Sequence, residues 1–513
     1  MENLAPELLA LIVSELEPPL APLAALSRQW QHAIEPLTFA SLTLRPESEP
    51  DPKTNLTDLG QFSAAFSDPG RCRHLKHLEF RVAVPSPTEK RLRKLQGRRE
   101  SALNDAVYTR KVVDFFSILA RLFQTAPPTL SLVIKVYSLV DYQQPPPDYQ
   151  PQHWHLGEPM WSIRNHFKYI NFDAGLENGL ARVPAVSRFQ HGDEGFRNLN
   201  PAVISAYAAA LPNVETMDWF FIPPPRRLWE LRKSIRSSLA DALLASGSFL
   251  SQLTAFTISW QDSDPSNQLF DPGSYIDPSA SSPKDPLSIA MRRISQLPSL
   301  LHLKLLDCHT VSEELFGTTA ENRSDIGTWP SLRTFEVNMA LTTPDGRWYI
   351  TGRPEDGEEY SDRSDTSGEE HSTFDSADSD TSDWAPERAW DRENGMLGGR
   401  VFRYTPDNTT LVPLLASMAR AVTHMPSLRE LELRSSPHVD HMSFHYYAPR
   451  IGPVMTKGYG PNQVEEAFHL ARAHQPRWVI DLLGFNRAWK PPRHLQAAFD
   501  EVSGEGCVLI KQH

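Results

Sequence analysis

The fold is decided by a nine-residue stretch, PSLLHLKLL at 298–306, whose pattern recurs along the chain. Leu300, Leu303 and Leu305 occupy positions one, four and six of an L-x-x-L-x-L frame. The same frame fits five further windows, CRHLKHLEF (72–80), PNVETMDWF (212–220), SQLTAFTIS (251–259), PSLRTFEVN (330–338) and PSLRELELR (426–434). Alternating apolar residues at the end of each window are typical of a short strand with one buried face.

Stretches with helical spacing separate these windows, at 112–123, 201–211, 226–246, 286–297 and 411–425. Helix, proline-marked turn and short strand in repetition predict an α/β solenoid of leucine-rich-repeat type. The distances between windows are irregular, so we expect loops and insertions to interrupt the array, among them loops at 143–153 and 261–285. The alternative is a generic α/β domain that contains several leucine-rich strands.

The composition is that of a globular protein, because 40% of the 513 residues are hydrophobic and 22% are charged. The net charge of −12 is carried by one segment, 355–387, which holds thirteen acidic residues and a single basic one, Arg363. Like charges with little to bury predict a disordered acidic insert. The remainder is neutral overall, so we expect no general attraction to nucleic acid or to an anionic membrane.

Cysteines and the N-terminal stretch indicate the compartment. Cys72, Cys308 and Cys507 are too far apart for a disulfide framework or a CxxC zinc site. The N-terminal apolar stretch contains Glu7 and Glu15, which a secretory signal would not carry. No apolar run is long enough to span a membrane. We therefore expect an intracellular protein of the cytoplasm, the nucleus or both.

The first forty residues have the apolar spacing of three short helices, separated near Pro18-Pro19 and Leu26. Leu4-Ala5-Pro6-Glu7-Leu8, followed by Ile12 and Leu16 and closing on Ser27-Arg28-Gln29-Trp30, resembles an F-box. Membership of this family implies binding to the Skp-type adaptor and cullin complex of a ubiquitin ligase. The adaptor-binding residues would be Leu4, Pro6, Leu8, Ile12, Leu16, Leu23 and Trp30. The alternative is a helical cap that packs on the rest of the chain.

The C-terminal half resembles the corresponding part of fungal F-box proteins. Four stretches carry this resemblance: Trp329-Pro330-Ser331-Leu332, the run from Thr343 to Tyr349, the run from Phe402 to Asp407, and Met425-Pro426-Ser427-Leu428-Arg429. The expected organisation is an F-box-like helical domain at 1–42, a leucine-rich-repeat-like solenoid at 70–350, the disordered acidic insert at 355–387, and a continuation of the solenoid with a C-terminal cap at 400–513. The resemblance supports this architecture and says little about the substrate.

Catalytic motifs are absent from the sequence. It contains no phosphate-binding loop of the G-x-x-x-x-G-K-[ST] type, no G-x-G-x-x-G, no G-x-S-x-G and no H-E-x-x-H. His441 and His445 have a spacing at which two helical histidines share a metal, but Pro437 precedes them and a solvated loop is favoured. We therefore predict a protein that is not an enzyme and has no cofactor and no metal.

A protein substrate, whose identity the sequence does not reveal, is expected on the strands of the solenoid. Residues between the apolar positions of each frame point away from the core and would line a concave surface. The candidates for substrate binding are His77, Asp218, His302, Lys304, Glu336, Glu430 and Glu432. This set is acidic on balance, which predicts a partner with basic character, although the loops at 143–153 and 261–285 could carry recognition instead.

The predicted function is the substrate-recognition subunit of an SCF-type ubiquitin ligase. The alternative is a repeat scaffold without a link to ubiquitination.

Overall fold

The computed structural model describes residues 4–16, 20–45, 59–87, 96–138, 168–173, 176, 179–192, 197–277, 284–318, 327–356, 358–359, 393–396, 400–435, 441–451, 463–485 and 489–511. The chain forms two compact units. The first contains Met1–Phe221 and Ala245–Phe256, and the second contains Ile222–Leu244 and Thr257–His513. The predicted loop at 143–153 lies outside the described residues, as does most of the predicted acidic insert.

The fold is mixed α/β and is built on a large, mostly parallel sheet. Each of the six windows forms a strand, and each strand begins two residues after the first apolar position of its window. These strands are β2 (His77–Val84), β5 (Thr216–Phe221), β6 (Ala255–Trp260), β7 (His302–His309), β8 (Thr334–Met339) and β13 (Glu430–Ser435). The first apolar residue, such as Leu300, is buried on the turn that leads into the strand. The frame therefore encodes a turn and a strand together.

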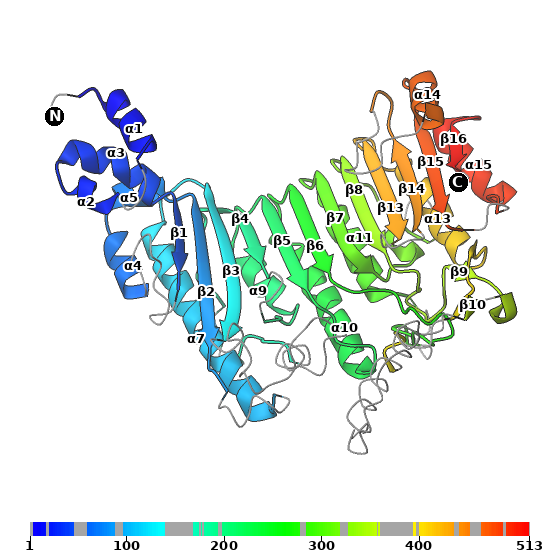
Figure 1. Ribbon diagram of the computed structural model, residues 1–513, viewed down its shortest axis with the longest axis horizontal. Coiled ribbons are helices and arrows are strands. Elements are labelled where there is room, and N and C mark those ends of the chain that lie inside the picture. Colours follow the sequence, from blue (N-terminus) through cyan, green and yellow to red (C-terminus); the bar gives the residue numbers. More distant parts are fainter. Residues whose placement is uncertain are drawn as a thin grey trace, which may run out of the picture. The chain divides into compact units, whose positions relative to one another are not determined.

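Strands of the first unit follow one another in chain order and run parallel. They are β1 (Ser41–Leu44), β2, β3 (Leu130–Ser138), β4 (Val186–His191) and β5. Figure 1 shows β1, β2 and β3 side by side, with helix α7 (Arg98–Leu122) along them. Phe80 of β2 stacks on Phe115 of α7, with 4.1 Å between the ring centroids. In each unit, we call the sheet face covered by the helices that connect successive parallel strands, such as α7 between β2 and β3, the inner face, and the opposite one the outer face.

The second unit also keeps chain order, through β7, β8, β13, β14 (His441–Tyr447), β15 (Arg477–Leu483) and β16 (Val508–Lys511). β7, β8 and β13 are parallel, β14 is antiparallel to both neighbours, and β16 is parallel to β15. Two short pairs lie outside this sheet, β9 (Ile350–Thr351) with β12 (Thr405–Pro406) and β10 (Glu358–Glu359) with β11 (Arg400–Val401). The expectation of a solvated loop at His441 and His445 is wrong, because both residues belong to β14.

The five predicted helices are present as α7, α9 (Val203–Ala210), α10 (Trp229–Ser246), α11 (Pro286–Ser295) and α13 (Leu411–Val422). The C-terminal part adds α14 (Gln463–Ala471) and α15 (Arg493–Ser503). Short 3-10 helices occur at Glu313–Leu315 and Pro354–Asp356. Asp285 caps α11 by accepting a hydrogen bond from the backbone N–H of Ser288 at 3.1 Å.

Three short helices occupy the N-terminal region, as the sequence predicts. They are α1 (Pro6–Ser14), α2 (Ala21–Ala24) and α3 (Arg28–Thr38), and α4 (Leu59–Ala65) and α5 (Pro69–His74) follow β1. Ser27 caps α3, because its hydroxyl accepts a hydrogen bond from the backbone N–H of Trp30 at 3.4 Å. Leu9, Val13 and Ile34 are buried and form the small core of this helical group.

The predicted loop at 261–285 contains no helix or strand at 261–277, yet this part is packed against the rest of its unit. The side-chain oxygen of Gln268 accepts hydrogen bonds from the backbone N–H groups of Phe402 at 2.7 Å and Arg403 at 2.5 Å. Asp264 accepts one from the backbone N–H of Leu341 at 2.8 Å. The described part of this loop is thus a structural element of the second unit rather than a free insertion.

Candidate interaction surfaces

The N-terminal helices carry an unusual amount of exposed apolar surface. Six of the twelve exposed large apolar side chains among the described residues belong to this group, namely Leu8, Leu11, Ile12, Leu16, Leu26 and Leu37. Helix α1 has two apolar sides, since Leu9 and Val13 are buried whereas Leu8 is 52% exposed. Soluble proteins rarely gather so much exposed apolar surface unless it contacts a partner. We call these six residues the apolar face.

The predicted adaptor-binding residues divide between this face and its surroundings. Leu8, Ile12 and Leu16 belong to the apolar face, whereas Leu4, Leu23 and Trp30 are half-buried. Pro6 is the first residue of α1. Sequence reasoning missed Leu11, Leu26 and Leu37. The spacing of Leu8, Leu11 and Ile12 is itself helical, so this second side of α1 was visible in the sequence.

The helical group is attached to its unit by polar and aromatic contacts. Glu35 of α3 forms an ion pair with Arg71 of α5, with 2.9 Å between Nη2 and Oε1. The Arg71 guanidinium also lies 5.4 Å from the ring centroid of Phe39, which packs edge-on against Phe66. None of these four residues belongs to the apolar face, whose side chains stay exposed.

On the outer face of the first unit, one carboxylate is surrounded by two cations. Glu79 of β2 pairs with Arg81 on its own strand and with Lys135 of β3 at 3.7 Å. His77 is half-buried, and its Nδ1 lies 3.4 Å from the hydroxyl of Ser131. Asp218 of β5 is half-buried opposite Gln190. Two strands, β3 and β4, therefore separate Asp218 from His77 within the first unit.

The outer face of the second unit brings the other five predicted residues together. Strand register places His302, Thr334, Glu430 and Tyr447 in one row across β7, β8, β13 and β14. The adjacent row contains Lys304, Glu336, Glu432 and His445. Neighbouring strands lie about 4.8 Å apart, so side chains within a row are in contact range. We call these two rows, with Arg434, the charged cluster.

Ion pairs link most of the charged cluster. Glu336 contacts Lys304 at 3.2 Å and Arg434 at 3.0 Å. Glu432 lies 3.5 Å from Arg434 and 3.7 Å from Nε2 of His445. In contrast, the Glu430 carboxylate forms no ion pair and no hydrogen bond within the part of the chain that the structure describes. Three carboxylates face two permanent cations, and the unmatched one is Glu430.

Burial and mutual repulsion change the acidity of these carboxyl groups. Burial raises the pKa of Glu432 to about 7, and the neighbouring Glu336 and Glu430 contribute to this increase while Arg434 opposes it. The pKa of Glu430 is raised for the same reasons. Burial lowers the pKa of His302, and the nearby Arg333, Lys304 and Arg429 lower it further. The cluster therefore favours an added cation near Glu430 and Glu432.

Helix α14 covers the outer face next to the charged cluster. Arg477 of β15 donates a hydrogen bond from Nε to Nδ1 of His469 on α14 at 2.7 Å, and its guanidinium lies 5.4 Å from the Tyr447 ring centroid. Lys511 of β16 pairs with Glu465 of α14 and with Asp481 at 3.3 Å. Outer-face residues of β15 are consequently buried. The accessible part of this face ends at β14.

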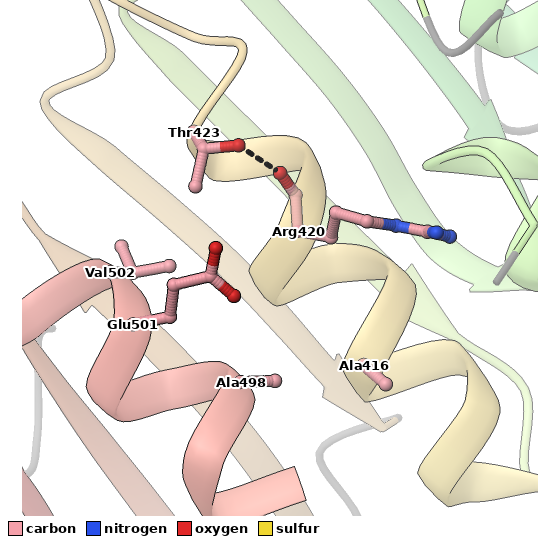
Figure 2. A pocket seen from close by; sticks show the side chains of 6 residues that line it. All are labelled: Ala416, Arg420, Thr423, Ala498, Glu501 and Val502. Atoms are coloured by element: carbon pink, nitrogen blue, oxygen red, sulfur yellow. Dashed lines mark hydrogen bonds between the residues drawn. The ribbon is translucent and has the colours of Figure 1, made fainter. Parts of the chain in front are cut away.

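Two cavities lie within the described part of the second unit. One cavity of about 170 Å³ lies between α13 and α15 and is lined by Ala416, Arg420, Thr423, Ala498, Glu501 and Val502. Figure 2 shows the Arg420 side chain extending away from Glu501, and Arg420 donates to the backbone oxygen of Thr318. Another, of about 200 Å³, is polar and includes Glu313, Asp345 and Arg347 among its lining residues. Asp345 and Arg347 are paired there at 2.7 Å.

Reactive thiols and metal ligands are not evident in the described residues. Cys72, Cys308 and Cys507 are all buried, and burial with nearby carboxylates raises the pKa of Cys308 further above its usual range. No group of three or more histidine, cysteine or carboxylate residues within the described ranges could hold a metal ion. Among the described helices, none combines the length and apolar character needed to cross a membrane.

Comparison with known proteins adds no relative. No protein-family model matches the chain, and no curated protein matches it at a significant level.

Proposed function

We propose that this protein is a non-catalytic substrate receptor of an SCF-type ubiquitin ligase. The N-terminal helices would act as an F-box that binds the Skp-type adaptor, and the strands would form an irregular leucine-rich-repeat-like solenoid that binds a protein substrate. The receptor would raise the local concentration of substrate lysines near a ubiquitin-charged enzyme. The observation that carries the proposal is the apolar face, in a segment whose sequence resembles an F-box.

Two further features support the assignment of adaptor binding to the N-terminal helices and substrate binding to the strands. The apolar face and the charged cluster are built from different parts of the chain, so one can bind an adaptor while the other binds a substrate. Strands that follow chain order, with helices between them, are typical of repeat arrays. The parallel pairing of the strands at the recurring windows is in keeping with a leucine-rich-repeat-like arrangement.

The rival function is a repeat scaffold in which the N-terminal helices only cap the fold. That role would require the apolar side chains of these helices to pack against the neighbouring chain. Instead, Leu9, Val13 and Ile34 supply the internal packing, and Leu8, Leu11 and Ile12 remain exposed. A helix that only caps the fold requires one apolar side, which packs on the chain. A helix that also binds a partner requires a second, exposed apolar side, as α1 has.

A capture experiment tests the proposal. Leu8→Asp should reduce adaptor binding at least tenfold, because it places a carboxylate within an apolar contact. Leu103→Asp on α7 is a matched control, since both leucines are 52% exposed. The full-length chain and both variants would be titrated with a purified Skp-type adaptor, and circular dichroism would confirm that they are folded. Equal adaptor binding by the folded Leu8→Asp variant would disprove the F-box assignment.

A further inference from the structure

The outer face of the second unit contains an unfilled position for a positive charge. Glu336 is already neutralised by two cations, Lys304 and Arg434. Glu430 has no such partner among the residues that the structure describes, and Glu432 shares Arg434 with Glu336. Glu430 and Glu432 are half-buried rather than fully buried, and Lys304 in the row of Glu432 is 50% exposed at its side chain. An incoming cation can therefore contact the cluster from the solvent side.

We propose that Glu430 and Glu432 receive an arginine or lysine side chain from an extended, basic segment of a protein partner. This inference deepens the proposed function, on which it rests only for identifying the partner as the substrate. The two carboxylates lie two residues apart on one strand, at roughly 7 Å, which allows one guanidinium or ammonium group to contact both. Tyr447 borders the position and presents a rigid side chain beside it.

The neighbouring charges define how the site should respond to pH. Groups that face Glu432 are Lys304 on β7, Glu336 on β8, Glu430 and Arg434 on β13, and His445 and Tyr447 on β14. Beyond them, Arg477 of β15 and Glu465 of α14 also influence Tyr447. Without a partner, the pKa of Glu432 is about 7. A bound cation stabilises the ionised carboxylate, so binding should release a proton and should strengthen as the pH rises through 7.

Helix α14 limits where the partner can lie. It buries the outer-face residues of β15, including Arg477 and Asp481. Its own ion pair with Lys511 keeps it on that surface. The partner segment must therefore lie over β7, β8 and β13 and stop at β14, with its cation near that end of the accessible surface.

A peptide-binding experiment tests this inference. The probe is a fluorescein-labelled peptide of alternating arginine and serine, and its uncharged counterpart alternates glutamine and serine. Binding to the full-length protein would be followed by fluorescence anisotropy at physiological salt. Glu430→Gln should weaken binding of the arginine peptide about tenfold at pH 8, and Glu432→Gln should remove the pH dependence. The acidic segment 355–387 is present in every variant, so it does not contribute to the difference.

Glu79→Gln is the matched control, because Glu79 lies on the outer face of the first unit and is already paired with Arg81 and Lys135. We expect it to bind the arginine peptide as the unaltered protein does. Equal binding by Glu430→Gln and the unaltered protein would overturn the inference, as would equal binding of the glutamine peptide. Neither result would affect the adaptor test at Leu8, so the two proposals can fail separately.

Discussion

The two units contain contrasting buried polar clusters. One cluster of the first unit is neutral and aromatic: the hydroxyls of Tyr108 and Tyr207 are 2.5 Å apart, and His191 stacks on Trp219 with 5.5 Å between the ring centroids. One cluster of the second unit is charged and paired: Arg236 contacts Asp285 at 2.6 Å, and Arg232 pairs with Asp262. Both arrangements satisfy or avoid buried charge, but they are sensitive to opposite changes.

This difference predicts which change, the loss or the gain of a charge, should destabilise each cluster. A buried ion pair is costly to break, because removing one partner leaves the other charge unpaired in a medium of low polarity. A buried neutral cluster is instead damaged when one of its members gains a charge. The first unit should therefore be sensitive to protonation and the second to loss of a single charge.

The largest expected effect is that of Asp285→Ala in the second unit. This change leaves Arg236 without its carboxylate and removes the cap of α11, so the free energy of unfolding should fall by about 3–5 kcal/mol. Urea denaturation followed by tryptophan fluorescence would measure the loss. The double variant Arg236→Met with Asp285→Ala should recover part of it, because no charge is then left buried and unpaired. A loss below about 1 kcal/mol in the single variant would contradict this account of the second unit.

A smaller effect is expected in the first unit when the pH is lowered from 7 to 5. Burial lowers the pKa of His191 to about 3, and both ring nitrogens lack a hydrogen-bond partner within the described residues. In the unfolded chain, His191 takes up a proton near pH 6.5. The folded protein should therefore keep its full free energy of unfolding above that pH. This free energy should fall by on the order of 1 kcal/mol per pH unit between about 6.5 and 3.

Urea midpoints at pH 7 and pH 5 would measure this dependence. His191→Phe keeps an aromatic ring and should reduce the loss between these two pH values. His309 in the second unit is a useful comparison, since burial lowers its pKa to about 4 although it lies 3.1 Å from the backbone oxygen of Ile258. If His191→Phe loses as much stability on acidification as the unaltered protein, His191 is not buried in the neutral form.

The smallest effect concerns the tyrosine pair of the first unit. Tyr207→Phe removes one hydroxyl and leaves that of Tyr108 buried without this partner, so we expect a loss of about 1–2 kcal/mol. Replacing both tyrosines by phenylalanine should cost no more than the single change, because no unpaired hydroxyl remains. Thermal or urea unfolding of the two single variants and the double variant completes the cycle. Strictly additive losses would show that the two hydroxyls do not interact.

Much of the sheet could be predicted from the sequence, because a turn followed by a strand with one buried face produces the L-x-x-L-x-L pattern of apolar residues. The frame does not fit β3, whose LSLVIKVYS is buried on both faces and lacks the alternation. It also does not reveal β14, which runs against its neighbours. The spacing of apolar residues indicates which face of a strand is buried, but it does not indicate whether the strand is parallel or antiparallel to its neighbours.

The candidate surfaces could be predicted only in part. Outer-face positions such as Glu336 and Glu432 follow from strand alternation, and their grouping follows from strand order. The cover that α14 provides depends on contacts such as that between Arg477 and His469, which are remote from the frame. The buried role of Asp285 was equally invisible, because a carboxylate before Pro286 reads only as a helix cap or a solvated charge.

The pairing of β8 with β13 joins strands that lie far apart along the chain. Thr334 is opposite Glu430 and Met339 is opposite Ser435, yet the chain leaves one strand at Met339 and enters the next only at Glu430. The entropy of closing a loop grows with the logarithm of its length, so a connection roughly four times longer than that between β7 and β8 adds only about 1 kcal/mol. Insertions into this connection outside β9, β12 and α13 should therefore cost little free energy, and the sheet can keep its register while such segments change during evolution.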